Sequence, residues 1–199
     1  MPEIIFKYII GALLGIMFLA HGFWGARKRR NGSQPLTRRK RIAQVLAFCI
    51  FLTWTIFVAL YLFSAQLDGF AIALPIWLRW VGVAILLGGV ICFVSAYLTL
   101  GKNWSLHPEI RSDHVLVMNG IYTWIRHPMY TAYILLGVGF LLASANLLIG
   151  LTLLAPVLII CLTRIAAEEA MMIEKFGDAY REYKQRTGAL LPKIRFSKN

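Results

Sequence analysis

Long apolar runs constrain the fold of this chain more than any other feature. An α-helix rises about 1.5 Å per residue, so about 20 apolar residues cross a hydrocarbon layer of ~30 Å. The runs predict an all-α integral membrane protein of about five transmembrane helices, the fourth of them short. Only three residues separate the last two runs, which predicts a tight helical hairpin. The five runs are Ile4–Phe23, Ile42–Ala65, Ile76–Leu100, Pro128–Ala143 and Leu147–Thr163.

The composition agrees with a membrane protein. Hydrophobic residues make up 59% of the 199 residues and charged residues 15%, whereas a soluble domain carries about 25% charged residues. We expect the first run to be a membrane helix and not a signal peptide, because it lacks a small-residue cleavage site and cations follow it directly. The three cysteines lie inside apolar runs and are predicted to be buried hydrophobic side chains. Arg79 is predicted to extend from the third run toward the interface.

The charges are sorted along the chain. Lys and Arg number 21 against 9 acidic residues, and segments 24–41 and 164–199 each hold eight of these cations. Because Lys and Arg in short loops stay on the cytoplasmic side, we predict a cytoplasmic C-terminus, a cytoplasmic loop at 101–127 and an N-terminus outside. The net charge of +12 is then a topology signal. No nucleic-acid partner is expected, since the apolar runs leave no soluble core beneath a basic face.

The segment Gly101–Tyr130 is dense in His, Trp, Tyr, Arg and Gly. Loops of this length are usually functional or disordered, and its apolar residues need a surface to bury on, so we favour a functional loop over an interfacial aromatic belt. Within it, Arg126-His127-Pro128 opens the fourth run. Proline suits a first helical turn, and the free amides there favour an anion.

A polar set follows the fifth run. Arg164 and Glu168 are four residues apart and share one helix face. They could form a surface ion pair of little energetic value, or they could line a pocket at the cytoplasmic end of the hairpin, where ionisable groups are usually functional. We favour the pocket, because the small residues Ala166 and Ala167 leave room for a ligand.

Farther along, aromatic residues recur at helical spacing. Phe176, Tyr180 and Tyr183 lie at i, i+4 and i+7, which predicts a C-terminal interfacial helix. Motifs for phosphate loops, zinc ligation, redox cysteines and serine nucleophiles are not found in the sequence. Nothing therefore indicates a metal cofactor.

The sequence HVLVMNGIYTWIRHPMY is followed about forty residues later by EE, then by FGDAYREYK and LLP. This combination resembles the isoprenylcysteine carboxyl methyltransferase family of integral membrane enzymes, whose relatives act on phospholipids and small thiols. The resemblance covers roughly residues 80 to 192, and the first two runs match only in being apolar.

The resemblance implies an S-adenosylmethionine site at the cytoplasmic mouth of the hairpin, with S-adenosylhomocysteine as the product. Position by position, Arg164 corresponds to a residue used near the substrate, and His107 stands where the eukaryotic enzymes use Gln for the cofactor. The implied cofactor-binding residues are His107, His114, Val115, Leu116, Val117, Tyr122, His127, Pro128, Met129, Tyr130 and Glu168.

Methyl transfer is an in-line displacement that needs orientation and a dry site more than proton shuttling. A carboxylate or thiolate acceptor is already nucleophilic, and Arg164 could position it by charge-assisted hydrogen bonds. An amine acceptor would need a base, for which Glu169 is a weak candidate. The predicted catalytic residues are thus Arg164, Glu168 and Glu169.

Two functional portions are expected. Residues 1–100 would hold three transmembrane helices and the basic loop 24–41, and residues 101–199 the cofactor loop, the hairpin 128–163 and the interfacial helix. The leading hypothesis is a methyltransferase whose lipophilic or lipid-anchored acceptor, most like a prenylcysteine carboxylate, arrives through membrane lipids. Phospholipid-amine or small-thiol methylation remain alternatives. A non-catalytic transporter or assembly protein is the alternative from another class, although it would have no reason to keep a polar set at membrane depth.

Overall fold

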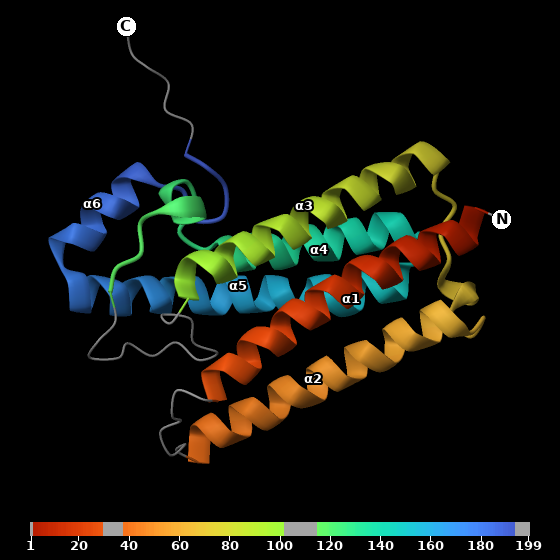
Figure 1. Cartoon of the computed structure of the whole chain (residues 1–199), viewed down its shortest axis with the longest axis horizontal. Coiled ribbons are helices and arrows are strands. Elements are labelled where there is room, and N and C mark those ends of the chain that lie inside the picture. Colours follow the sequence, from red (N-terminus) through yellow and green to blue (C-terminus); the bar gives the residue numbers. More distant parts are fainter. Residues whose placement is uncertain (1, 30–37, 102–114, 194–199) are drawn as a thin grey trace, which may run out of the picture.

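The computed structural model describes residues 2–29, 38–101 and 115–193, and helices account for the regular structure of this part of the chain. This confirms the all-helical prediction. The helices are α1 (Pro2–Arg29), α2 (Arg38–Phe63), α3 (Ile76–Leu100), α4 (Pro128–Ser144), α5 (Leu147–Phe176) and α6 (Asp178–Arg186), with 3₁₀ turns η1 (Asp68–Phe70) and η3 (Gly120–Thr123). In Figure 1, the N-terminus and α6 lie at opposite ends of the bundle.

Two helices of the described part, α3 and α5, are long and apolar enough to cross a membrane. The third apolar run was predicted with the bounds that α3 has, and α4 is short, at 17 residues, as expected. Large apolar side chains such as Ile91, Leu98 and Leu162 are exposed on the outer faces of these helices. Such a surface suits contact with lipid. The count of five spans remains a prediction.

Helices α3 and α4 pack with their backbones in contact. A Cβ atom added at Gly139 would lie 2.5 Å from the backbone nitrogen of Leu86, and one at Gly82 would lie 2.5 Å from that of Ala143. Only glycine permits this approach, which is typical of close helix pairs in membranes. Leu86 and Phe140 are fully buried at the centre of the resulting core, which α1 and α2 extend.

The α4–α5 turn is as tight as predicted. Ala145 adopts a left-handed conformation with a φ of 49°, and the Asn146 side chain caps α5 by accepting a hydrogen bond from the amide of Ile149 at 3.2 Å. The same side chain donates to the carbonyl of Leu67 at 2.7 Å. The turn therefore also fixes the segment between α2 and α3.

Arg79 is buried near this turn, so the prediction that it extends to the interface was wrong. Its guanidinium donates to both carboxylate oxygens of Glu3 at 2.6 and 3.1 Å, and to the carbonyl of Ala143 at 3.1 Å. The guanidinium also lies 4.0 Å from the ring centroid of Phe6. These partners satisfy the charge inside the bundle, because α1 covers the start of α3.

The predicted C-terminal aromatic helix is divided in two. Helix α5 continues past Thr163 to Phe176, and Gly177, with a φ of 54°, ends it before α6 begins. Tyr180 and Tyr183 are buried on α6. The stripe therefore packs against the protein. Of the cysteines, Cys161 is buried as predicted, whereas Cys49 is exposed because it lies on an outer face of α2.

Candidate functional site

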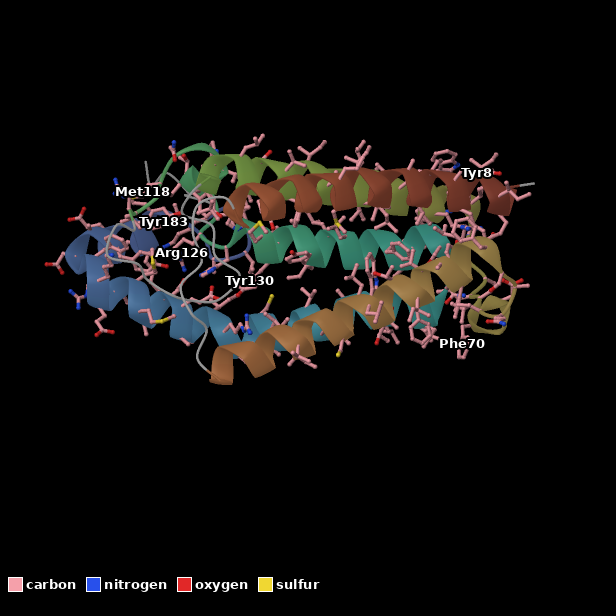
Figure 2. The ribbon with its side chains drawn as sticks, turned by 60° about the horizontal axis from the view of Figure 1, so that its bottom comes forward. Tyr8, Phe70, Met118, Arg126, Tyr130 and Tyr183 are labelled. Atoms are coloured by element: carbon pink, nitrogen blue, oxygen red, sulfur yellow. The ribbon has the colours of Figure 1, made fainter. Side chains whose placement is uncertain are left out.

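The candidate site lies at the end of the bundle away from the tight turn, where α4 begins and α5 approaches α6. Figure 2 shows Arg126, Tyr130 and Tyr183 at this end, and Tyr8 and Phe70 at the other. The segment after α6 folds back beside the start of α4. There the amide of Arg126 donates to the carbonyl of Gly188 at 2.9 Å, and that of His127 donates to Ala189 at 3.0 Å. The C-terminal segment thus becomes one wall of the site.

Glu169 is a buried carboxylate neutralised by two cations. Its Oε1 atom lies 2.8 Å from both Nε and Nη2 of Arg126, and its Oε2 atom lies 2.6 Å from Nζ of Lys184. The side chains of Glu169 and Arg126 are only 8% and 7% exposed. Buried charges of this kind need complete pairing. This residue therefore joins α5 to the start of α4 and to α6.

Arg126 also contacts the end of α6 directly. Its Nη1 donates to the carbonyl of Lys184 at 3.1 Å and to the carbonyl of Thr187. Every guanidinium nitrogen of Arg126 therefore has an acceptor within the protein. The planar fork of arginine suits such a multiple contact.

The neighbouring Glu168 has a different environment. Its Oε1 accepts a hydrogen bond from the Tyr130 hydroxyl at 2.6 Å, and its Oε2 lies 3.7 Å from Nδ1 of His127. The side chain is 23% exposed. One carboxylate oxygen of Glu168 is therefore available to a cationic ligand, in contrast to those of Glu169.

His127 lies between the two glutamates. Its Nε2 is 3.4 Å from Oε1 of Glu169, and its ring stacks on that of Tyr130 with centroids 5.8 Å apart. Burial lowers the pKa of His127 below its usual value, and this effect outweighs the opposing attraction to Glu169. The imidazole is therefore neutral near pH 7 and does not add a cation to the site.

The remaining predicted residues are only partly brought together. Arg164 is exposed and makes no hydrogen bond or ion pair to the described residues, although its charge acts on Glu168 and Tyr130. Tyr122 is buried and its carbonyl accepts a hydrogen bond from the Tyr183 hydroxyl at 2.6 Å. Pro128 is buried at the start of α4. Leu116, Val117 and Met129 are half-buried and Val115 is exposed. His107 and His114 lie outside the described residues.

Sequence reasoning missed Lys184, Thr187 and Leu190 as parts of this end of the bundle. Thr131 donates through its hydroxyl to the carbonyl of Leu190 at 2.6 Å, which fixes the last described segment against α4. The closing LLP of the resemblance was the only signal for this segment. A hollow of about 420 Å³ is lined by Met118, Thr123, Trp124, Tyr183, Arg186, Thr187 and Lys193.

Comparisons with known proteins agree with these observations. The model of the isoprenylcysteine carboxyl methyltransferase (ICMT) family matches residues 80–174. A protein-S-isoprenylcysteine O-methyltransferase of Tribolium castaneum is 32% identical over 120 residues, which cover 59% of this chain and 43% of the relative. The enzyme of the same name from Xenopus laevis is 34% identical over 123 residues, covering 60% and 42%. The match spans less than half the length of these curated relatives.

The fold comparison covers more of the chain. The solved structure of the eukaryotic intramembrane Ras methyltransferase ICMT matches with a TM-score of 0.59 and 26% sequence identity, over 98% of this chain and 68% of that one. The structural match therefore includes α1 and α2, where the sequence resemblance consists only of apolar character. Taken with the match of the family model to residues 80–174, it confirms that this chain resembles the isoprenylcysteine carboxyl methyltransferase family.

Proposed function

We propose that this chain is an integral membrane S-adenosylmethionine-dependent methyltransferase whose acceptor is lipophilic, most like a prenylcysteine carboxylate. The observation that carries the proposal is the partly exposed carboxylate of Glu168, held by Tyr130 beside His127 at the start of α4. Ionisable groups at membrane depth are costly and usually functional.

The residues present suit the cofactor. S-adenosylmethionine carries an ammonium, a carboxylate, a sulfonium and an adenine, and when bound it supplies an electrophilic methyl group. Glu168 would accept the cationic part, the start of α4 suits the carboxylate, and the half-buried Leu116 and Val117 with Tyr122 offer an apolar surface for the adenine. We keep His107 and His114 as further proposed contacts.

The chain's own contribution is orientation and charge. Tyr130 donates to one oxygen of Glu168 and so fixes the direction of the other. Arg164, exposed on α5 one turn before Glu168, would hold an acceptor carboxylate by charge-assisted hydrogen bonds. An ionised carboxylate or thiolate needs no base, so positioning within a site that excludes water supports the reaction.

The environment of Glu169 favours a carboxylate or thiolate over an amine acceptor. An amine would need a proton acceptor, and both oxygens of Glu169 are engaged by Arg126 and Lys184. We therefore assign Glu169 to positioning and not to proton transfer. Phospholipid amines stay a second candidate, which would have to use Glu168 or solvent as the base.

The positive-inside pattern supports a topology with the site and the C-terminus in the cytoplasm and the N-terminus outside. The bundle agrees, since the N-terminus and α6 lie at opposite ends in Figure 1. The acceptor would enter laterally from the bilayer and the cofactor from water. A reporter fused to the C-terminus should behave as cytoplasmic, and an external signal would contradict this arrangement.

The direct test is S-adenosylhomocysteine binding to the purified protein, followed by transfer of labelled methyl from S-adenosylmethionine to a farnesylated cysteine derivative, a phosphatidylethanolamine or a small thiol. We expect binding by the wild type, loss of binding in Glu168→Gln, and retained binding with lost turnover in Arg164→Ala. Arg181→Ala, an exposed arginine on α6, is the matched control. Absence of binding by the wild type would refute the enzyme and favour the non-catalytic membrane protein.

A further inference from the structure

We propose that Lys184 is a positioning residue of this site, holding the Arg126–His127 turn against the C-terminal segment. The inference rests on the proposed function for its effect on the cofactor, but its structural part stands on the contacts alone. Lys184 lies outside the residues matched by the family model. Neither the sequence patterns nor the resemblance gives it a role.

The first step is that the two oxygens of the Glu169 carboxylate have different cationic partners. Arg126, from the residues just before α4, occupies Oε1, and Lys184, from α6, occupies Oε2 at 2.6 Å. The carboxylate is buried on α5, while the Lys184 side chain is 45% exposed. A half-exposed ammonium thus reaches inward from the surface and completes the charge balance of a buried group. Without it, one oxygen of Glu169 loses its only hydrogen-bond donor among the described residues.

The second step is that Lys184 contacts the Arg126–Glu169 ion pair through two of its own groups. Its backbone carbonyl accepts from Nη1 of Arg126 at 3.1 Å, while its ammonium contacts the carboxylate that Arg126 also contacts. Arg126, Glu169 and Lys184 therefore form a closed ring of contacts. A ring of this kind fixes the distance between α6 and the start of α4 more firmly than one ion pair would, because each of the three residues contacts both of the others.

The third step connects this ring to the groups that face the ligand. The carbonyls of Gly188 and Ala189, a short way beyond Lys184, accept from the amides of Arg126 and His127. The His127 imidazole in turn lies between Glu169 and Glu168, stacked on Tyr130. A shift of α6 would therefore displace the turn that sets the His127 and Tyr130 side chains, and with them the free oxygen of Glu168.

The test compares three full-length variants in detergent. Lys184→Met keeps most of the length of the side chain and removes the charge, and Lys184→Arg keeps the charge. Arg181→Met removes an exposed cation one turn away that pairs only with Asp178 among the described residues. Hydrogen–deuterium exchange of the amides of Arg126 and His127 reports on the turn. Binding of S-adenosylhomocysteine and steady-state kinetics report on the site.

In Lys184→Met, we expect the amides of Arg126 and His127 to exchange at least about fivefold faster than in the wild type. We also expect S-adenosylhomocysteine to bind about tenfold more weakly, which is an effect typical of coupling between residues in contact. The KM for the methyl donor should rise about tenfold with kcat within about threefold. Lys184→Arg should restore each value to within about twofold, and Arg181→Met should leave all of them unchanged.

Unchanged exchange and unchanged binding in Lys184→Met would overturn the proposal, as would an equal effect in Arg181→Met. If Lys184→Met fails to fold, the proposal is decided by Lys184→Arg, because full recovery of exchange protection and affinity supports a charge requirement and loss of either overturns it. If the wild type binds no S-adenosylhomocysteine, the proposed function fails, and the exchange rates alone decide whether Lys184 holds the turn.

Discussion

Replacing Glu169 by glutamine would show how much of the site's stability depends on one carboxylate. Truncating one member of a buried ion pair typically costs about 3–5 kcal/mol. Here the cost is reduced, because Lys184 is half exposed and can return to water, and because Arg126 keeps two carbonyl acceptors. We expect the free energy of unfolding to fall by about 2–3 kcal/mol.

The assay is thermal unfolding of the cofactor-free protein in one detergent. A loss of this size lowers the melting temperature by about 4–12 °C in a chain of this length. Glu168→Gln is the matched control, since its amide oxygen can still accept from Tyr130 and its side chain is 23% exposed, so its loss should stay below about 1 kcal/mol. Equal melting temperatures for the two variants would refute the division of roles between the adjacent glutamates.

Three further predictions concern the bundle and its response to pH. Arg79→Met leaves the carbonyl of Ala143 without its side-chain donor, so the free energy of unfolding, measured in thermal melts, should fall by about 2–3 kcal/mol. The affinity for S-adenosylhomocysteine should stay within twofold of the wild type. A larger change in affinity would contradict the independence of the Arg79 end of the bundle from the candidate site. Gly139→Val should abolish monodisperse protein in size-exclusion chromatography, because α3 backbone lies 2.5 Å from the new Cβ, whereas Gly88→Ala, with no atom within 4 Å, should not. Because the pKa of His127 is lowered on folding, the unfolded state binds more protons below about pH 6.5, and stability should fall from pH 7 to pH 5; a His127→Asn variant with the same slope of melting temperature against pH would contradict this.

The helical bundle could be predicted from the apolar runs, because a segment in contact with lipid must be apolar and a segment in contact with water is polar. Helix α3 has its predicted bounds, since Pro75 stands before it and Gly101, with a φ of 49°, ends it. The α4–α5 turn was predictable for a similar reason, because a polar pair in an apolar stretch leaves little choice of turn. The Arg126-His127-Pro128 opening of α4 and the polar face at Glu168 were likewise visible as spacing.

The partners of these charges could not be predicted. Arg79 was expected at the interface because burying a charge in an apolar helix is unfavourable. Hydropathy does not show that Glu3 pairs with this arginine. The same limit hid Lys184, which is brought to Glu169 only because Gly177 turns α6 back over the end of α5. Glu169 is paired and Glu168 is available to a ligand only because of the residues that the tertiary structure brings beside them. Spacing from Arg164 placed Glu168 on the predicted pocket face, but it did not show that Arg126 and Lys184 pair with Glu169.

The return of the C-terminal segment to the start of α4 also has a consequence for biosynthesis. Thr131 and Leu190, which contact each other, are separated by 59 positions in the chain. At a synthesis rate of about 5–20 residues per second, the ribosome adds Leu190 roughly 3–12 s after Thr131. The helical hairpin is completed during this interval, and Arg126 and then Glu169 are made before Lys184 and the carbonyls beyond it. Translation must therefore proceed past α6 before every contact at the start of α4 can form.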